Sequence, residues 1–336
     1  MDGQYTPGPR PSPAAMPDVV VVGAAARDIA PDDERGWRLG GGVSYSSLTV
    51  ARLGLRTGAL IGLDGEAGDA RELDLLREAG VDVRVVPLAN GPVFSNIEQR
   101  GGRLQLCHGR SDPIPVTALP PEWASARGWI LAPVAAEIPE AWADVPAEDA
   151  IVALGWQGLL RELVPGEPVR HSAPRPHPVL GRADLVGVSR DDVDPAIALA
   201  DLYGLLHPGA MLAITRGDHG GLVVEGVEDD QLQLRHYPAV KSPSIVDPTG
   251  AGDVFLAALA ATRIQPRLVG GRIGQGMDLL IAASAASLVL EAPGLTGIPT
   301  RDQVRQRAVG ARRPIGRGGG LPGSRTGRRP DDEPDR

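Results

Sequence analysis

Short, continuous apolar runs recur along most of this chain, and amphipathic stretches separate several of them. Six runs have the length and apolar content of strands that are buried on both faces of a sheet. These runs cover residues 18–23, 57–62, 129–133, 150–154, 184–188 and 210–215. Helical patterns at residues 43–53 and 70–79 end at Gly54 and Gly80, as left-handed helix caps favour. The alternation predicts an α/β fold with a doubly wound, mostly parallel sheet flanked by helices.

Two further runs break this alternation. Residues 81–86 and 93–106 are strand-like, and Gly101-Gly102 provides a turn inside the second run. They predict a small antiparallel β flap. Because open α/β sheets bind ligands at the carboxyl ends of their strands, a flap there would form a lid that excludes water. An ordinary edge hairpin is the alternative.

The two ends of the chain differ from the middle. Residues 1–16 are rich in proline and residues 311–336 in arginine and glycine, and neither shows an apolar period. We expect a disordered arm and a disordered tail. Between them, residues 17–310 are predicted to form one domain, with a β lid contributed by about residues 31–42 and 81–110.

Composition excludes several classes of protein. A net charge of −8 argues against binding built on nucleic-acid phosphates, so a small-molecule partner and no nucleic acid are expected. Cys107 is the only cysteine, which excludes an intrachain disulfide and a cysteine-rich zinc site. We find neither a secretory pattern nor an apolar run of membrane-spanning length, so no membrane partner and a cytoplasmic location are expected.

Lysine is nearly absent, because Lys241 is the only one among 34 basic residues. P-loop enzymes need a Gly-Lys-Ser/Thr sequence and protein kinases need a lysine on their third strand, and neither motif occurs here. Any phosphate chemistry must therefore depend on backbone amides, arginine and metal ions.

The most distinctive motif is Asp247-Pro248-Thr249-Gly250-Ala251-Gly252-Asp253, which precedes an apolar helical pattern at residues 256–261. Glycines at the start of a helix expose N–H groups at the positive end of the helix dipole, where an anion binds. Asp253 would lie within reach of the proton of an attacking hydroxyl. The motif therefore favours phosphoryl transfer to an alcohol. The structural alternative is a tight turn with Asp253 as a first-turn charge.

Over roughly residues 17–307 the chain resembles the ribokinase/PfkB family of carbohydrate kinases. Residues 247–253 resemble the family's C-terminal signature. Gly40-Gly41-Gly42, followed by a helix that ends Ala51-Arg52-Leu53-Gly54, is similar to its N-terminal glycine motif. Residues 213–217 and 220–224 look like the strand–turn–strand that borders the nucleotide.

The resemblance implies a catalytic centre at the C-terminal signature. Asp253 would be the general base. The anion hole for the γ-phosphate would be formed by three backbone amides, those of Gly250, Ala251 and Gly252. ATP and Mg²⁺ are implied as cofactors, with a monovalent cation at Asp247 as an open question.

Nucleotide and substrate contacts are also implied. Thr215, Gly217 and Thr249 would lie on the nucleotide side, although Thr215 and Gly217 fit a plain strand–strand turn equally well. Asp28 would bind substrate hydroxyls, since a carboxylate accepts from both hydroxyls of a diol; capping of a turn is its alternative. Gly41 and Gly42 would let a ligand approach the backbone, or would simply form a tight turn.

Four residues depart from the family or hint at a subgroup. Tyr45 stands where many members carry an asparagine that contacts sugar, so this contact is either lost or replaced by the phenol of Tyr45. Ser189 and Asp192 replace an Asn-x-x-Glu pattern; Asp192 would hold Mg²⁺ through water, whereas a helix cap at Ser189 is the alternative. Gln157 belongs to a Gln-Gly-x-x-Arg stretch that, with residues 133–137, resembles inositol-kinase-like members. On a helix, Gln157 and Arg161 would share one face, for ligand binding or for surface packing.

These observations predict an ATP- and Mg²⁺-dependent kinase acting on a hydroxyl of a small sugar or polyol, with an inositol-like acceptor as one option. A nucleoside kinase of the same fold is the first alternative. A binding or regulatory protein that retains the kinase fold without turnover is the second. Related kinases form dimers through their flaps, so a homodimer through the β lid is also considered.

Overall fold

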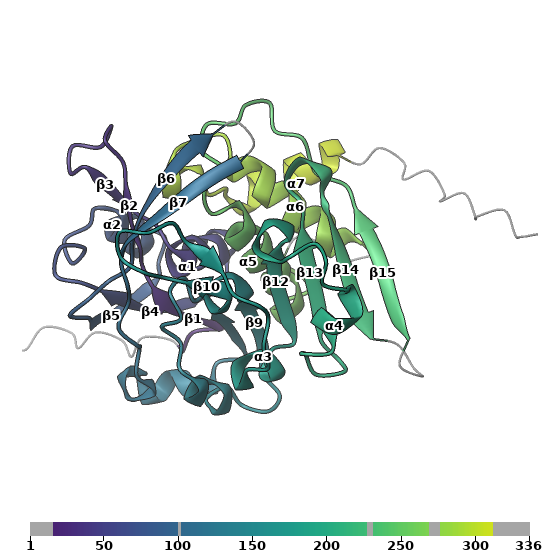
Figure 1. The fold of residues 1–336 in the computed structure, drawn as a ribbon. Coiled ribbons are helices and arrows are strands. Elements are labelled where there is room, and N and C mark those ends of the chain that lie inside the picture. The colour runs from purple at the N-terminus through teal and green to yellow at the C-terminus, as the bar shows by residue number, and fades with distance from the viewer. Residues whose placement is uncertain (1–15, 100–101, 227–230, 269–275, 312–336) are drawn as a thin grey trace, which may run out of the picture.

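A large mixed sheet forms the centre of the molecule (Figure 1). The computed structural model describes residues 16–99, 102–226, 231–268 and 276–311. The nine strands are, in spatial order, β15 (Leu232–Tyr237), β14 (Gly221–Gly226), β13 (Met211–Thr215), β12 (Leu185–Ser189), β9 (Ile151–Gly155), β8 (Gly128–Leu131), β1 (Val19–Ala24), β4 (Thr57–Leu63) and β5 (Asp82–Pro87). Neighbours from β13 to β5 pair in parallel, whereas β14 is antiparallel to both of its neighbours. All six strands predicted from apolar runs lie in this sheet, and the predicted fold class is confirmed.

The alternation of side chains along β1 explains why the sheet needs cover on both faces. Val19 and Val21 belong to one hydrophobic cluster and Val20 and Val22 to another, and all four are fully buried. A strand buried on both faces must be apolar at every position, which is why β1 reads as an uninterrupted valine run.

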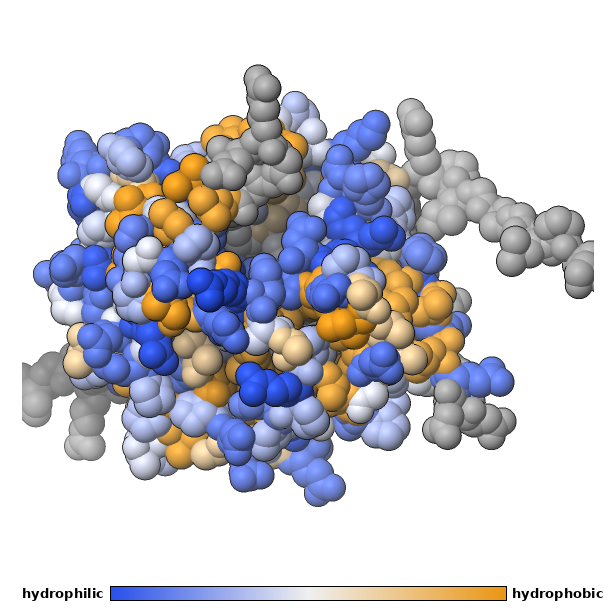
Figure 2. All heavy atoms as spheres, viewed as in Figure 1, coloured by the Kyte–Doolittle hydropathy of each residue, from blue (hydrophilic) through white to orange (hydrophobic). Residues whose placement is uncertain are grey.

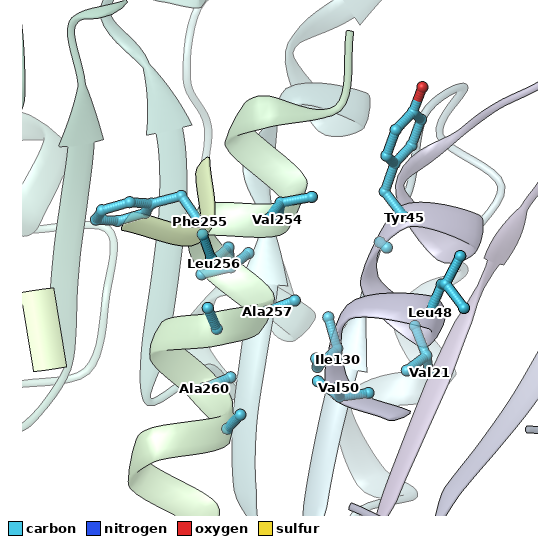
Figure 3. Close-up of a cluster of buried hydrophobic side chains, with 14 of the residues drawn as sticks. Val21, Tyr45, Leu48, Val50, Ile130, Val254, Phe255, Leu256, Ala257 and Ala260 are labelled. Atoms are coloured by element: carbon cyan, nitrogen blue, oxygen red, sulfur yellow. The ribbon is translucent and has the colours of Figure 1, made fainter. Parts of the chain in front are cut away.

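The two faces are covered differently. The larger helices pack on the first face: α1 (Gly42–Leu53), α2 (Glu72–Glu78), α5 (Ala251–Ile264), α6 (Met277–Val289) and α7 (Arg301–Ala311). Figure 3 shows α1 and α5 side by side, with Tyr45 and Val50 of α1 and Val254 and Ala257 of α5 in one hydrophobic cluster. The second face is covered by α3 (Pro178–Arg182), α4 (Leu199–Tyr203), short 3₁₀ turns and four buried tryptophans. The glycine stops are confirmed, because Gly54 and Gly80 have φ of 106° and 83°.

A second, four-stranded sheet has the order β3-β2-β6-β7. Its strands are β3 (Trp37–Leu39), β2 (Arg27–Ile29), β6 (Val93–Gln99) and β7 (Gly102–Gly109). β2 and β6 pair in parallel and the other neighbours are antiparallel. We call these four strands the small sheet; it corresponds to the predicted flap.

Two details of the flap prediction are corrected. β5 was assigned to the flap, but it extends the large sheet beside β4. It is an edge strand with partly exposed side chains, so its apolar pattern resembles that of a flap strand. The small sheet also begins at Arg27, before residue 31. Gly101 and the predicted arm and tail, apart from Met16 and Ala311, lie outside the described residues.

The outer edge of β7 is paired with another segment of the same chain. The segment between β10 (Arg161–Glu162) and β11 (Arg170–His171) runs beside β7, where Cys107 N–H donates to Glu167 O (3.0 Å) and Val169 N–H to Gln105 O (2.9 Å). This segment therefore ties the small sheet to the body of the protein.

The surface seen in Figure 2 mixes hydrophilic and apolar residues. Among the described residues, no helix is long and apolar enough to cross a bilayer.

Candidate active site

A cavity of about 790 Å³ lies where the small sheet meets the carboxyl ends of β9, β12 and β13 and the start of α5. The predicted site residues that line it are Asp28, Gly41, Gly42, Tyr45, Gln157, Ser189, Asp192, Thr215, Gly217, Thr249, Gly250, Ala251, Gly252 and Asp253. The fold thus brings together residues from both ends of the sequence.

The N-terminus of α5 opens into this cavity. Gly250 is its N-cap, with φ of 78° in the left-handed region, and Val254 N–H donates to Gly250 O (2.9 Å) to begin the helix. A Cβ placed on Gly252 would meet no other atom within 4 Å, so open space lies directly over this residue. An anion in that space would face the positive end of the helix dipole.

Asp253 lies in the first turn of α5 and faces the glycine motif of α1. A Cβ on Gly42 would lie 2.8 Å from Asp253 Oδ1, so only glycine leaves room for this carboxylate. Burial raises the pKa of Asp253 to about 6; Asp192 also raises it, whereas Arg161 lowers it. At neutral pH Asp253 is therefore mostly ionised, and it is a stronger base than an exposed aspartate.

The glycine run separates two carboxylates. A Cβ on Gly40 would overlap Asp28 Oδ2, whereas the corresponding position on Gly42 faces Asp253. Gly41, with φ of 85°, packs against Ala24 O and has no space for a side chain. The three glycines thus form a flat strip of backbone between Asp28 and Asp253.

Two polar residues of the small sheet hold Asp28 and were missed by the sequence interpretation. Asn96 Nδ2 donates to Asp28 Oδ1 (3.5 Å), and Gln105 Nε2 donates to Asn96 Oδ1 (2.9 Å). Both residues line the cavity. They are cross-strand partners in β6 and β7. Two polar residues at paired positions of the predicted flap hairpin could have indicated from the sequence that they lie at the site.

Arg161 also lines the cavity and was left out of the predicted site. Its Nη1 donates to Val134 O (3.3 Å), and its guanidinium lies 5.5 Å from the ring centre of Phe94. Burial lowers the pKa of Arg161, whereas Asp192, Asp253 and Asp28, in that order, oppose this effect. Arg161 is thus the positive charge among the carboxylates of the site.

The stretch from Gln157 to Arg161 is not the helix that its spacing suggested. Residues Trp156–Leu160 form a 3₁₀ turn, and Arg161 begins β10. Gly158 packs so tightly on Val134 and the residue before it that no Cβ fits there, which favours the tighter turn. Gln157 Nε2 donates to both oxygens of Asp192 (3.1 and 3.2 Å). Gln157 therefore contacts the cavity while orienting Asp192.

Glu137 fixes the loop that carries Val134. This carboxylate is 1% exposed and accepts N–H groups from Ala24 (2.9 Å), Val134 (3.1 Å) and Ala135 (2.8 Å). Burial raises the pKa of Glu137, and backbone N–H groups, including those of these three residues, oppose that rise. Glu137 thereby supports Arg161 through the carbonyl of Val134.

On the nucleotide side, Ser189 caps the 3₁₀ turn that follows β12, because its Oγ accepts Asp191 N–H (3.2 Å). This is the capping role that was the alternative to a ligand contact. Thr215 ends β13, and Gly217 has φ of 55° in the following turn. Asp192 lines the cavity beside them. The Asp192 carboxylate would suit Mg²⁺, which keeps most of its waters and binds phosphate oxygens. Within the described ranges there is no cluster of three metal-ligating side chains. A Mg²⁺ ion held mainly by water and phosphate oxygens does not need such a cluster.

Asp247 does not belong to the cavity lining among the described residues. Its Oδ1 accepts Thr249 N–H (2.9 Å) and its Oδ2 accepts Gly294 N–H (2.9 Å). These bonds tie the turn before α5 to the turn that follows α6.

Two sequence comparisons match parts of this chain to kinases. Residues 183–301 match the pfkB family carbohydrate kinase profile. A nucleoside kinase of Methanocaldococcus jannaschii is 33% identical over 101 residues, which are 29% of this chain and 28% of that protein. Thus the sequence match spans under a third of that relative.

Solved structures match over much more of the chain. A pyrophosphate-dependent myo-inositol-1 kinase, converted into a myo-inositol-3 kinase by two substitutions, superposes with a TM-score of 0.64 at 16% identity, covering 88% of this chain and 99% of that one. A ribokinase of Arabidopsis thaliana, in complex with ribose and ATP, gives 0.61 at 20% identity over 87% and 99%. The chain therefore has the ribokinase fold, and its C-terminal part carries the pfkB carbohydrate kinase sequence pattern.

Proposed function

We propose that this protein is a kinase that transfers the γ-phosphate of ATP to a hydroxyl of a small polyol or sugar. The observation that carries the proposal is the pairing at the start of α5. The first turn of α5, with its N–H groups, and the half-buried Asp253 carboxylate line one cavity together with Asp28, the proposed hydroxyl-binding group. An anion-binding helix end beside a base suits phosphoryl transfer to an alcohol.

In the proposed reaction Asp253 accepts the proton of the acceptor hydroxyl as its oxygen attacks the γ-phosphorus. The amides of Gly250, Ala251 and Gly252 hold the charge on the transferred group, and Thr215, Gly217 and Thr249 border the donor. Mg²⁺, held through water by Asp192, would neutralise phosphate charge. The small sheet acts as the lid that excludes water from the reaction.

The acceptor side of the cavity favours a polyol such as an inositol, or a sugar. Asp28, Asn96, Gln105 and Arg161 supply hydrogen-bonding groups of both kinds, which suits a ring of hydroxyls. A nucleoside would need an aromatic surface for its base, and the Phe94 ring on this side already contacts Arg161. The nucleoside kinase match keeps this acceptor as the second candidate.

Three accessory features complete the proposal. A monovalent cation would bind near Asp247, the carboxylate that joins the turn before α5 to the turn that follows α6. A homodimer through the lid would use the outer face or the β3 edge, since the β7 edge is paired within the chain. The cytoplasm, where ATP is abundant, is the proposed compartment.

The test is ADP release by the purified protein with ATP and Mg²⁺ against a panel of inositols, pentoses, hexoses and nucleosides. We expect one acceptor class, led by polyols and sugars, to stimulate ADP release. Asp253→Asn, which retains the shape of the side chain, is the control and should not respond. If no member of the panel stimulates ADP release while ligands still raise the melting temperature, the protein would instead be a binding protein without turnover.

A further inference from the structure

Tyr45 has a place in the structure that its expected role as a sugar contact does not explain. Its ring packs against Gly250, because a Cβ on Gly250 would lie only 2.5 Å from the ring Cγ and nearer still to Cδ1 and Cε1 on one side of the ring. The residue is 2% exposed, although it lines the cavity. Figure 3 shows the side chain rising from α1 beside the start of α5.

Gly250 is the residue whose conformation directs the proposed anion hole. It holds φ of 78° and ψ of 0°, and the amides that follow it take their direction from this turn. A left-handed glycine has a wide range of accessible backbone angles, so its position depends on what surrounds it. The ring of Tyr45 limits that range from the side of α1.

The other support of this turn comes from Asp247. Its carboxylate holds Thr249 N–H and Gly294 N–H at 2.9 Å each, and the Tyr45 hydroxyl lies 4.0 Å from where a Cβ on Gly294 would be. The turn is therefore held between a carboxylate that bonds its backbone and a ring that packs on its Cα.

We propose that Tyr45 is a positioning residue for the anion hole, and that its ring, rather than its hydroxyl, does this. The inference rests on the proposed function. A flat ring can pack closely on a glycine Cα, whereas a branched aliphatic side chain leaves a gap into which the turn relaxes. Amides displaced by even 1 Å would stabilise a phosphoryl group in transfer poorly, while nucleotide and acceptor would still bind.

Two substitutions separate the ring from the hydroxyl. Tyr45→Phe keeps the ring and removes the hydroxyl, whereas Tyr45→Leu removes the ring. Leu48→Ala, on the same helix and fully buried, is the control for a general loss of packing. Each variant is compared in calorimetric titrations of Mg-ADP, with and without aluminium fluoride, a mimic of the phosphoryl group in transfer.

We expect aluminium fluoride to tighten ADP binding at least about tenfold in the wild type, in Tyr45→Phe and in Leu48→Ala. Tyr45→Leu should lose most of this gain while binding Mg-ADP alone as the wild type does. With the acceptor identified, kcat of Tyr45→Leu should fall about 10- to 100-fold with the acceptor KM within about threefold.

Two results overturn the inference while leaving the proposed function intact: an undiminished gain in Tyr45→Leu, or a loss in Tyr45→Phe equal to that in Tyr45→Leu. A rise in acceptor KM in Tyr45→Phe would assign Tyr45 to substrate binding instead. If the wild type itself shows no gain with aluminium fluoride, the anion hole of the proposed function is wrong and the role of Tyr45 fails with it.

Discussion

At the scale of single residues, the environment of Asp253 determines how the activity depends on pH. Its pKa is raised from 3.8 to about 6, mainly by burial. Only the ionised carboxylate accepts the hydroxyl proton. We therefore predict that kcat/KM is level above pH 7 and falls about tenfold per pH unit below pH 6. A profile that shows no decline between pH 7 and pH 5 would contradict Asp253 as the base.

The same raised pKa has a consequence for stability. The native state binds a proton on Asp253 more tightly than the unfolded state does, so stability is lost as the pH rises from about 4 to about 6. Asp253→Asn removes this cost. We expect the variant to be more stable at pH 8 by on the order of 1–3 kcal/mol, at 1.36 kcal/mol per pKa unit. Urea unfolding of both proteins at pH 8 and pH 4.5 measures the difference, which should shrink at the lower pH.

At the scale of secondary-structure elements, the first turn of α5 separates stability from activity. A Cβ at Gly252 would meet no atom and would project into the open space over the helix end. Gly252→Ala should therefore raise helix stability by up to about 1 kcal/mol. It should also lower kcat at least about tenfold, because the methyl group occupies the place of the phosphoryl group.

Gly310→Ala is the matched control. Gly310 lies in α7, where an added Cβ likewise meets no atom, but it is exposed and is not part of the cavity lining. Its activity should equal that of the wild type. Thermal melts and initial rates of both variants measure these effects, and full activity in Gly252→Ala would place the phosphoryl group elsewhere.

The elements also show what the sequence could and could not predict. Apolar runs and glycine stops are local signals, and they located the six buried strands and the ends of α1 and α2 correctly. β5 was misplaced because an edge strand and a flap strand have the same half-exposed pattern. Asn96, Gln105 and Arg161 were not assigned to the site from the sequence, although the polar flap positions and the Gln-Gly-x-x-Arg stretch were signals for them. The pairing of β6 with β7 and the 3₁₀ turn before Arg161 bring these residues to the cavity.

At the scale of the whole molecule, we expect the cavity lining to favour a nucleotide as the donor over pyrophosphate, although several solved structures with this fold are of pyrophosphate-dependent kinases. The lining includes an apolar group, which we call the apolar wall and which would suit a base: Val240, Ile245, Ala286 and Leu290. Among the described lining residues the cations are Arg161 and Lys241.

We therefore predict that ATP supports turnover at least about 100-fold better than pyrophosphate at equal concentrations with Mg²⁺, since pyrophosphate would leave the apolar wall without a partner. The measurement is acceptor phosphorylation with each donor, using tripolyphosphate as the control for charge. Equal rates with ATP and pyrophosphate would show that the apolar wall contributes nothing to the reaction.

The most direct test of the whole account is transfer of a labelled γ-phosphate from ATP to the acceptor in a single turnover, with the wild type and Asp253→Asn compared at saturating ATP. We predict that the label moves into a phosphomonoester of the acceptor in the wild type, and that the rate falls about 10²–10⁴-fold in the variant with ATP binding unchanged. Equal transfer in both proteins, or label released only as inorganic phosphate, would contradict it.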